Sequence, residues 1–236
     1  SAVLQCIRGC GNAEVARIVL TASGGPFRAW TPERLATATP ADALRHPTWQ
    51  MGAKISIDSA TLANKALEVI EAHFLFGLPY DRIEAVVHPQ SIIHSMVEFV
   101  DGSVLAQMGL PSMELPIQYA FTFPERLADA RRRWDPVAAG ALTFEPVREG
   151  AFPIFRLGVD AGRAGGAAPA VFNAANEVAV AAFLRGAIPF AGIARAVETA
   201  LAAWDGGAAA TLDAVLVADA WARRLAETFV RSSPLC

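Results

Sequence analysis

Cysteine is scarce in this sequence, and the few that occur are poorly placed for cross-links. Three of the 236 residues are cysteines. A C-x3-C pair with one isolated C-terminal cysteine matches neither a disulfide framework nor the spacing of a zinc knuckle. We therefore expect Cys6, Cys10 and Cys236 to be reduced thiols of a cytoplasmic protein.

The sequence also lacks a dominant charge, a basic run and a long apolar stretch. Its 20 Lys and Arg residues stand against 23 Asp and Glu residues, which gives a formal net charge of -3. A basic surface that binds nucleic acid or an anionic membrane is therefore not expected. The chain is 53% hydrophobic, yet no run of about 18 apolar residues occurs, so we expect a soluble protein with a small-molecule site.

Signals that begin many chains are missing as well. The sequence starts at Ser1 without a methionine, and no basic segment followed by an apolar segment marks a secretory signal. Neither a G-x-G-x-x-G dinucleotide fingerprint nor a P-loop occurs anywhere. We expect residues 1–6 to continue from an upstream segment.

The first half of the chain has the pattern of an α+β domain with a mixed sheet of about four strands and flanking helices. β-branched or alternating apolar residues predict strands at 15–21, 83–87, 92–99 and 103–108. The dipeptide Asp101-Gly102 separates the last two strands and is typical of a hairpin turn. Between 32 and 57 the sequence predicts two short helices and a loop rich in Pro, Trp and Met.

A longer helix is predicted over 60–76, where apolar residues recur at spacings of three and four. Asp58 or Ser59 would cap its first turn. The second half is predicted to be a C-terminal four-helix bundle, with helices at 153–164, 169–185, 189–203 and 211–231.

Three parts of the chain follow from these patterns. Residues 1–123 are expected to form an α+β domain. Residues 124–150 have weak periodicity and many Pro, Arg, Trp and Gly residues, which indicates a linker. Residues 151–236 are expected to form the helical bundle.

One face of the predicted 60–76 helix collects chemically useful side chains. Asn64 and Glu68 are four residues apart, and Lys65 and Glu71 each lie three residues from Glu68, so all four share a face. Ser59 at the expected helix N-terminus would add a hydroxyl beside free backbone N–H groups, where phosphate binds readily. The spacing leaves open a solvated surface with an ordinary Lys–Glu ion pair.

Two loops are further candidates for a ligand site. Residues 21–26, T-A-S-G-G-P, follow a predicted strand, and their amides and hydroxyls suit phosphate oxygens, although most such stretches are simple turns. Residues 45–52, R-H-P-T-W-Q-M-G, place an imidazole, an indole and a thioether in one loop. That composition suits either a lid that closes over a ligand or a loop docked permanently on the core.

Other polar residues have structural interpretations. His88 and His94 lie around the start of a predicted strand, where hydrogen-bonded structural histidines are more frequent than ligands. Asn173, Asn176 and Glu177 interrupt an apolar helix. We interpret these three as satisfied buried polar groups.

A series of motifs follows in one order along the chain. They are L-T-A-S-G-G-P-F-R at 20–28, R-H-P-T-W-Q-M-G at 45–52, K-I-S-I-D-S-A-T at 54–61, N-K-A-L-E-V-I-E-A at 64–72, H-P-Q-S-I-I-H-S at 88–95, D-G-S-V-L-A-Q-M-G at 101–109 and N-A-A-N-E-V at 173–178. Together they resemble the 1-deoxy-D-xylulose 5-phosphate reductoisomerase family. The resemblance covers essentially the whole chain and is closer in 15–120 than afterwards.

The resemblance implies an enzyme of the non-mevalonate isoprenoid pathway. Such an enzyme rearranges 1-deoxy-D-xylulose 5-phosphate to a branched aldehyde phosphate and reduces that product with NADPH to 2-C-methyl-D-erythritol 4-phosphate. It also requires Mg2+, Mn2+ or Co2+. The resemblance further implies a homodimer formed through the α+β domain.

The residues that match the family motifs take their roles by implication. Five polar residues would hold the phosphate or the substrate backbone: Ser23, His46, Ser59, Asn64 and Lys65. Glu68 would contact the substrate and bind the metal. The catalytic residues would be Glu68, Lys65 and His46. Lid residues Trp49 and Met51 would contact the substrate, Gly52 would lie near the cofactor, and His94 and Met113 would line the pocket at most.

The sequence departs from the family pattern at its front. Family members begin with a Rossmann-like NADPH domain, followed by an Asp-Ser-Glu-His stretch whose two carboxylates complete the metal site. Neither feature precedes residues 1–5 here, so Glu68 remains as one carboxylate, which is too few for firm binding of a hard cation. We therefore expect that this chain alone neither oxidises NADPH nor turns over the substrate.

Two other hypotheses stay open at this point. A metal-dependent sugar-phosphate isomerase or lyase would need no nucleotide domain, and tight metal binding by the chain itself would favour it. A non-catalytic dimerising module would pair its 92–108 strands across subunits and leave the polar helix face solvated. An unchanged turnover after Glu68→Ala would favour that second alternative.

Overall fold

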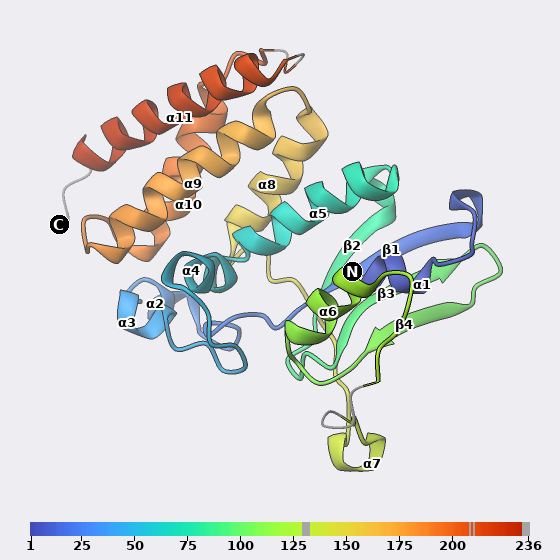
Figure 1. Ribbon diagram of the computed structural model, residues 1–236. Coiled ribbons are helices and arrows are strands. Elements are labelled where there is room, and N and C mark those ends of the chain that lie inside the picture. Colours follow the sequence, from blue (N-terminus) through green and yellow to red (C-terminus); the bar gives the residue numbers. More distant parts are fainter. Residues whose placement is uncertain (129–132, 208, 210, 233–236) are drawn as a thin grey trace. The chain divides into compact units, whose positions relative to one another are not determined.

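Figure 1 shows the computed structural model of the chain, which describes residues 1–128, 133–207, 209 and 211–232. The chain forms two compact units, each discontinuous in sequence. The first consists of Ser1–Ser23 and Ala72–Val147, and the second of Gly24–Glu71 and Arg148–Cys236. Residues 24–71 therefore fold with the helices of the second half, not with the strands that flank them in the sequence.

The first unit is built around a mixed sheet with the strand order β4-β3-β1-β2-β5. Its strands are β1 (Val15–Ala22), β2 (Ile83–Val87), β3 (Ile93–Phe99), β4 (Val104–Met108) and β5 (Glu145–Pro146). β1 pairs in parallel with β2, and the other neighbours are antiparallel. The four predicted strands are confirmed to within one residue at each end, and the sheet has one strand more than predicted.

The burial of the strands follows their sequence pattern. In β3, Ile93, Ser95, Val97 and Phe99 are buried and alternate with partly exposed residues, as expected for a strand with one covered face. The hairpin turn after β3 is confirmed. The φ of Gly102 is 83°, and the Asp101 side chain accepts a hydrogen bond from the Ser103 N–H at 2.9 Å.

The extra strand β5 lies in the segment that was predicted to be a linker. Gln90 Nε2 donates to Thr143 Oγ1 at 2.8 Å, and His88 Nδ1 lies 2.9 Å from the Thr143 carbonyl oxygen. These contacts hold the chain beside β2, where two residues then pair. A two-residue strand carries no periodicity, and its partners are more than 50 residues away, so the sequence pattern contained no signal for it.

Short helices complete the first unit. They are α1 (Ala2–Cys6), 3-10 helices at Asn12–Glu14 and Tyr80–Arg82, α6 (Glu114–Thr122) and α7 (Pro136–Ala139). Helix α1 packs against β3 and β4, with Val3 and Cys6 buried. The predicted continuous domain over 1–123 differs from the observed unit, which leaves out 24–71 and includes the chain up to Val147.

The second unit is helical. It contains α2 (Pro32–Leu35), α3 (Pro40–Ala43), α4 (Ala53–Thr61), most of α5 (Ala63–Phe76), α8 (Pro153–Ala164), α9 (Ala168–Leu184), α10 (Phe190–Ala202) and α11 (Leu212–Ser232). The last four helices end within one residue of the predicted bounds. Helix α9 is central and packs against α8, α10 and α11, with Phe172 and Phe183 at most 1% exposed. None of the described helices is long and apolar enough to cross a membrane.

The prediction of one helix over 60–76 is wrong. The chain forms two helices, α4 and α5, separated by Leu62, which has a φ of 66° in the left-handed region. The Ala63 N–H donates a hydrogen bond to Thr61 Oγ1 at 3.3 Å, and the Leu62 N–H donates one to the Ser59 carbonyl oxygen at 3.3 Å. Hydroxyl side chains compete in this way with the helical hydrogen-bond pattern, while the apolar spacing continues across the break.

Candidate functional site

The α5 polar face, defined here as Asn64, Lys65 and Glu68, occupies the first two turns of α5. Asn64 Nδ2 donates to Glu68 Oε1 at 2.6 Å, and Lys65 Nζ donates to Glu68 Oε2 at 2.5 Å. One carboxylate thus fixes both an amide and an ammonium group. The structure brings together these three side chains, which the sequence placed on one face.

Burial separates this face from an ordinary surface ion pair. The Lys65 side chain is 9% exposed, whereas that of Glu68 is 37% exposed. Lysine is almost never buried unless it is paired, because its charge loses hydration. An oxygen-rich anionic ligand would interact favourably with such an ammonium, and a solvated face would leave Lys65 in water.

Ser59 lies in the last turn of α4 rather than at a helix N-terminus, so the expected cap at Asp58 or Ser59 is wrong. Asp58 is only 2% exposed and lies inside α4. The argument that a helix dipole at Ser59 attracts phosphate therefore does not apply. Ser59 is instead half-buried, a few residues before the α5 polar face.

The glycine-rich loop packs directly against this end of α4. Gly25 has a φ of 67°, and a Cβ atom there would lie 2.5 Å from the Ser59 carbonyl oxygen and 3.0 Å from the Ala60 Cα. Only glycine tolerates both the left-handed backbone and the close approach. The loop that carries Ser23 is thus packed tightly and is not a simple surface turn.

His46 organises the 45–52 loop from within. Its Nδ1 accepts hydrogen bonds from the Thr48 N–H at 3.1 Å and the Trp49 N–H at 2.9 Å. Nδ1 is therefore unprotonated, and a neutral ring carries its proton on Nε2. Burial lowers the pKa of His46, which favours this neutral form.

The other predicted residues of this loop differ in exposure. Trp49 and Met51 are half-buried, and Gly52 is exposed as the N-cap of α4. Gly52 has a φ of -61°, and nothing lies within 4 Å of the position that a Cβ would take. Neither backbone nor packing requires glycine at this position, so the space beside it is open to a ligand.

His94 and Met113, which were expected at most to line the pocket, belong to the first unit. His94 is in β3, and burial lowers its pKa despite a hydrogen bond with the Gly109 backbone. Met113 is 60% exposed just before α6. His88 is fully buried, with Nδ1 at the Thr143 carbonyl and Nε2 accepting from the Ile92 N–H at 3.2 Å, which supports the structural interpretation.

Metal ligands are few in the described part of the chain. No group of three or more His, Cys, Asp or Glu side chains there could hold a metal ion. Glu68 is a suitable single ligand, since hard divalent cations prefer carboxylate oxygens, but such cations take about six oxygens. The described residues therefore do not make up a metal site by themselves.

An ion pair next to Ser59, between the buried Asp58 and the half-exposed Lys54, was not anticipated. Lys54 Nζ lies 2.5 Å from Asp58 Oδ2, and Asn176 Nδ2 donates to Asp58 Oδ1 at 2.8 Å. The spacing of Lys54 and Asp58 by four residues was the one available signal. Asn176 is buried as expected, yet its Oδ1 has no hydrogen-bond partner among the described residues, so the expectation of full satisfaction is met only in part.

Asn173 and Glu177, which were expected to be buried, are half-buried, with 38% of the Glu177 side chain exposed, but both have hydrogen-bond partners. Asn173 Nδ2 donates to Glu177 Oε1 at 3.1 Å, and Arg223 of α11 donates to Glu177 Oε2 at 2.7 Å. Burial raises the pKa of Glu177, but these hydrogen bonds and the Arg223 charge outweigh it and lower the pKa overall.

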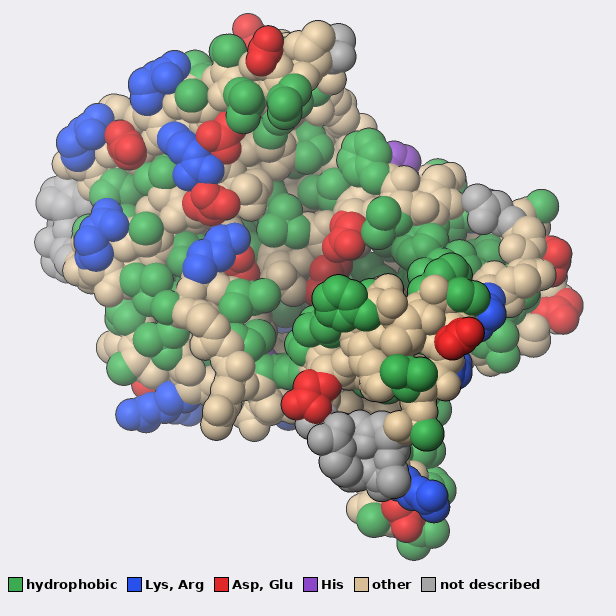
Figure 2. All heavy atoms as spheres, viewed as in Figure 1, with side chains coloured by type: hydrophobic (Ala, Val, Ile, Leu, Met, Phe, Trp, Pro, Cys, Tyr) green, Lys and Arg blue, Asp and Glu red, His purple; other side chains and the backbone are tan. Residues whose placement is uncertain are grey.

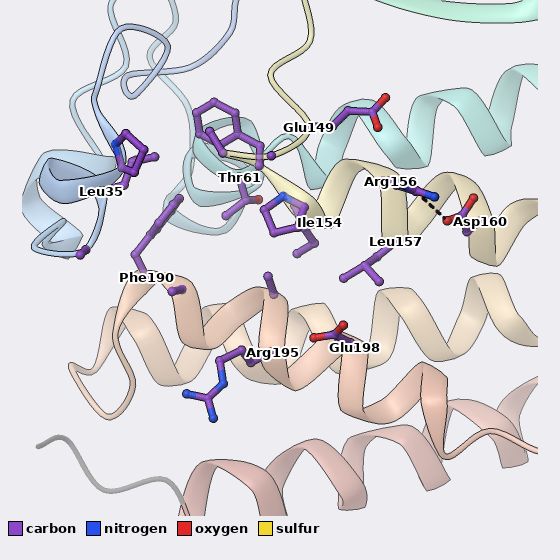
Figure 3. Close-up of a pocket in the computed structure, with 18 residues that line it drawn as sticks. Leu35, Thr61, Glu149, Ile154, Arg156, Leu157, Asp160, Phe190, Arg195 and Glu198 are labelled. Atoms are coloured by element: carbon purple, nitrogen blue, oxygen red, sulfur yellow. Dashed lines mark ion pairs between the residues drawn. The ribbon is translucent and has the colours of Figure 1, made fainter.

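Figure 3 shows a separate cavity in the helical unit, with a volume of about 650 Å³. It lies among α2, α8 and α10. Its lining combines apolar side chains such as Leu35 and Phe190 with five charged ones: Glu149, Arg156, Asp160, Arg195 and Glu198. Of the 18 described residues that line it, Thr61 is the only one from α4 or α5. Its charged lining holds three carboxylates against two arginines, which does not favour a phosphate anion, so the α5 polar face marks the candidate site better than this cavity does.

Comparisons with known proteins identify the family of the chain. Residues 1–76 match the model of the 1-deoxy-D-xylulose 5-phosphate reductoisomerase C-terminal domain, and residues 108–225 match that of the DXP reductoisomerase C-terminal domain. The chain is 54% identical to the 1-deoxy-D-xylulose 5-phosphate reductoisomerase of Gloeobacter violaceus over 99% of its own length and 60% of that relative. It is 53% identical to the enzyme of Pelotomaculum thermopropionicum, and the alignment covers 98% of this chain and 60% of that relative.

Solved structures of the same family have the same fold. The Zymomonas mobilis reductoisomerase in complex with NADPH is 44% identical, with a TM-score of 0.91. The superposition covers 98% of this chain and 60% of that structure's chain. A DOX-P reductoisomerase in complex with NADPH, fosmidomycin and magnesium is 37% identical, with a TM-score of 0.89. The superposition covers 98% of this chain and 61% of that structure's chain.

The chain thus spans about 60% of the length of the curated relatives it matches. The ordered motifs, the α5 polar face and the packed glycine-rich loop all occur within that shared part. With two matching family models and a common fold, the chain belongs to the 1-deoxy-D-xylulose 5-phosphate reductoisomerase family.

Proposed function

We propose that the protein containing this chain isomerises 1-deoxy-D-xylulose 5-phosphate and reduces the product to 2-C-methyl-D-erythritol 4-phosphate, in isoprenoid biosynthesis. The observation that carries the proposal is the buried Lys65 ammonium, held with Asn64 on the Glu68 carboxylate. Relatives named for this reaction, more than 50% identical over nearly the whole chain, support it.

The residues of the α5 polar face have distinct proposed roles. Lys65 and Asn64 donate hydrogen bonds to substrate oxygens, while the half-exposed Glu68 binds the substrate and a divalent cation. Ser23 and Ser59 supply hydroxyl donors to the phosphate. Because Lys65 is already held by Glu68 at 2.5 Å, little rotamer entropy is lost when the substrate binds.

The 45–52 loop has a proposed closing role. The ring of His46 fixes the backbone at Thr48 and Trp49, so the loop can move as a preformed piece. Trp49 and Met51 would then contact the substrate and exclude water, which strengthens the polar interactions beneath. The neutral state favoured by its lowered pKa lets His46 donate one hydrogen bond to the substrate through Nε2.

NADPH and a divalent cation are the proposed cofactors. Glu68 fits the cation as one ligand, and the open space beside Gly52 fits the approach of a flat nicotinamide ring. When bound, the cation would supply a Lewis acid and NADPH a hydride. Mg2+, Mn2+ and Co2+ all suit a carboxylate ligand, and structures of relatives contain magnesium.

The test uses Glu68→Gln in the protein expressed from its full reading frame. NADPH oxidation is measured with 1-deoxy-D-xylulose 5-phosphate and Mg2+. Loss of the carboxylate removes a metal ligand and the partner of Lys65, so we expect kcat/KM to fall about 100-fold or more. Glu71→Gln is the matched control, because Glu71 is an exposed carboxylate on the same helix and should retain wild-type turnover.

Two results would count against the proposed function. One is a wild-type protein that leaves 1-deoxy-D-xylulose 5-phosphate unchanged under these conditions. The other is Glu68→Gln with the same kcat/KM as Glu71→Gln, which would favour the dimerising module. Circular dichroism of both variants establishes that any loss of turnover is not a loss of folding.

We also propose a cytoplasmic homodimer formed through the β4 edge of the sheet. β4 ends the strand order, and Val104 and Leu105 in it are 52% and 49% exposed. Beyond β4, Ile117 and Phe121 of α6 are 48% and 87% exposed, and Figure 2 shows hydrophobic side chains on the face that carries α6. An apolar surface of this kind beside an open strand edge favours a second copy.

Leu105→Lys tests the dimer by light scattering after gel filtration. A charge at an apolar interface is costly, so we expect dissociation at protein concentrations at which the wild type is dimeric. Val137→Lys, at an 89% exposed position of α7, is the control. Equal masses for both variants would contradict the proposed interface.

A further inference from the structure

Helix α4 connects a residue predicted to lie near the cofactor with a residue predicted to hold the substrate. Gly52, at the end of the 45–52 loop, is its N-cap, and Ser59 lies in its last turn. Residues of one helix keep a fixed spacing of about 1.5 Å per residue along the axis. A shift of α4 therefore moves Gly52 and Ser59 together, and the contacts that hold α4 also place part of the site.

Asp58, the neighbour of Ser59, is a buried carboxylate with a partner for each oxygen. Its side chain is 2% exposed, and Lys54 Nζ lies 2.5 Å from Oδ2. Asn176 Nδ2 donates to Oδ1 at 2.8 Å from a position 118 residues further along the chain. Since Asn176 belongs to α9, this hydrogen bond ties α4 to the central helix of the bundle.

The chemistry of this contact is directional. Apolar side chains tolerate sliding and rotation of one helix on another, but a hydrogen bond weakens steeply with distance and angle. Breaking it would leave the buried carboxylate of Asp58 with an unsatisfied oxygen, which is strongly disfavoured. The contact between Asp58 and Asn176 therefore selects one position of α4.

Asn176 is also an unusual choice if stability alone is considered. The residue is fully buried, and its Oδ1 has no hydrogen-bond partner among the described residues. A well-packed apolar pair at these two positions would avoid that unsatisfied atom and the buried charge. A defined geometry explains the polar pair better than a gain in stability does.

We propose that the Asp58–Asn176 hydrogen bond positions α4 so that the Ser59 hydroxyl meets the sugar phosphate, and Gly52 the cofactor, in the geometry required for turnover. Asp58 is a positioning residue rather than a catalytic one, because both oxygens are buried and already bonded. The inference rests on the proposed function, in which Ser59 holds the substrate.

The first test compares Asn176→Ala with Asn173→Ala in the whole protein. Both remove an amide from α9, but Asn173 bonds Glu177 within its own helix and does not hold α4. We expect the KM for 1-deoxy-D-xylulose 5-phosphate to rise about tenfold in Asn176→Ala, with a smaller change in kcat. Asn173→Ala should keep the wild-type KM.

A second readout does not depend on activity. Amide hydrogen exchange reports local opening of each helix. In Asn176→Ala we expect faster exchange across Ala53–Thr61 at an unchanged rate in α9, whereas Asn173→Ala should leave α4 as in the wild type. Absence of wild-type turnover would refute the proposed function alone, and the exchange data would still decide whether Asn176 positions α4.

A rescue variant guards against a simple folding defect. Asn176→Asp places a second carboxylate against that of Asp58. It should raise the KM for 1-deoxy-D-xylulose 5-phosphate and the rate of amide hydrogen exchange in α4. Adding Asp58→Asn to it restores one donor and one acceptor, and we expect the KM to return to within about threefold of the wild type. Failure of this rescue in a folded double variant, or equal KM and exchange changes in the two alanine variants, would overturn the proposal.

Discussion

At the scale of single residues, Lys65 and Glu68 show how the site is prepared before a ligand arrives. The Lys65 ammonium is nearly buried and lies 2.5 Å from the Glu68 carboxylate. Burial removes hydration from the Lys65 charge, and the attraction of the Glu68 carboxylate, which is 37% exposed, offsets that cost. An ammonium held in this way remains complementary to an oxygen-rich anion.

Gly52 allows a test of the cofactor approach that leaves the fold nearly unchanged. Its backbone is in an ordinary region and its Cβ position is open, so Gly52→Ala should cost at most about 1 kcal/mol of stability, as expected for an N-cap. We expect the KM for NADPH to rise while the KM for the sugar phosphate stays constant. Steady-state kinetics with each substrate varied checks this, and an unchanged KM for NADPH would contradict the role of Gly52.

His94 gives a pH dependence with a defined sign. Burial, the main cause, lowers its pKa in the folded state, so the unfolded chain binds a proton more readily. Stability from this residue is therefore present above the unfolded value of about 6.5 and is lost as the pH falls through the folded pKa. We expect the free energy of unfolding, measured with urea, to fall less between pH 8 and pH 5 in His94→Gln than in the wild type. Equal losses in the two proteins would refute this role of His94.

At the scale of elements, the contact between the glycine-rich loop and the end of α4 is the tightest approach near the site. Gly25 meets the backbone of Ser59, whereas Gly9 has a similar φ of 87° and nothing within 4 Å of its Cβ position. Comparing alanine at the two positions separates backbone strain from steric overlap.

Gly25→Ala should therefore be more destabilising than Gly9→Ala. Strain alone costs about 1–2 kcal/mol, and overlap with the α4 backbone adds about 1–3 kcal/mol. Chemical denaturation of both variants measures the difference. We also expect Gly25→Ala to raise the KM for the sugar phosphate, because the overlap pushes the end of α4, which carries Ser59, out of place. A similar loss of stability in both variants would mean that the glycine-rich loop relieves the overlap with α4 by a small shift.

At the scale of the whole molecule, the number of metal ligands limits what the 236-residue chain does alone. Its described residues hold no group of three metal-binding side chains, and one carboxylate binds a hard cation weakly. We expect calorimetric titration of the chain with Mg2+ to give a Kd of about 1 mM or weaker. Micromolar binding would instead favour the metal-dependent isomerase or lyase.

Local sequence patterns were sufficient to predict the features that depend on neighbouring residues. The four longer strands, the hairpin at Asp101-Gly102 and the bundle helices follow from apolar periodicity and turn residues, and the ordered motifs indicated the family. Helix spacing also placed Asn64, Lys65 and Glu68 on one face. Each of these signals lies within a few residues of sequence, which is the range over which periodicity acts.

Only the tertiary structure decided the rest. The break at Leu62 depends on which hydroxyl reaches which amide, and the burial of Asp58 depends on Asn176, 118 residues away. The assignment of residues 24–71 to the helical unit and the short strand β5 likewise come from contacts between distant segments. Local patterns carry no information about such partners, because the free energy of these contacts is realised only when distant segments pack together.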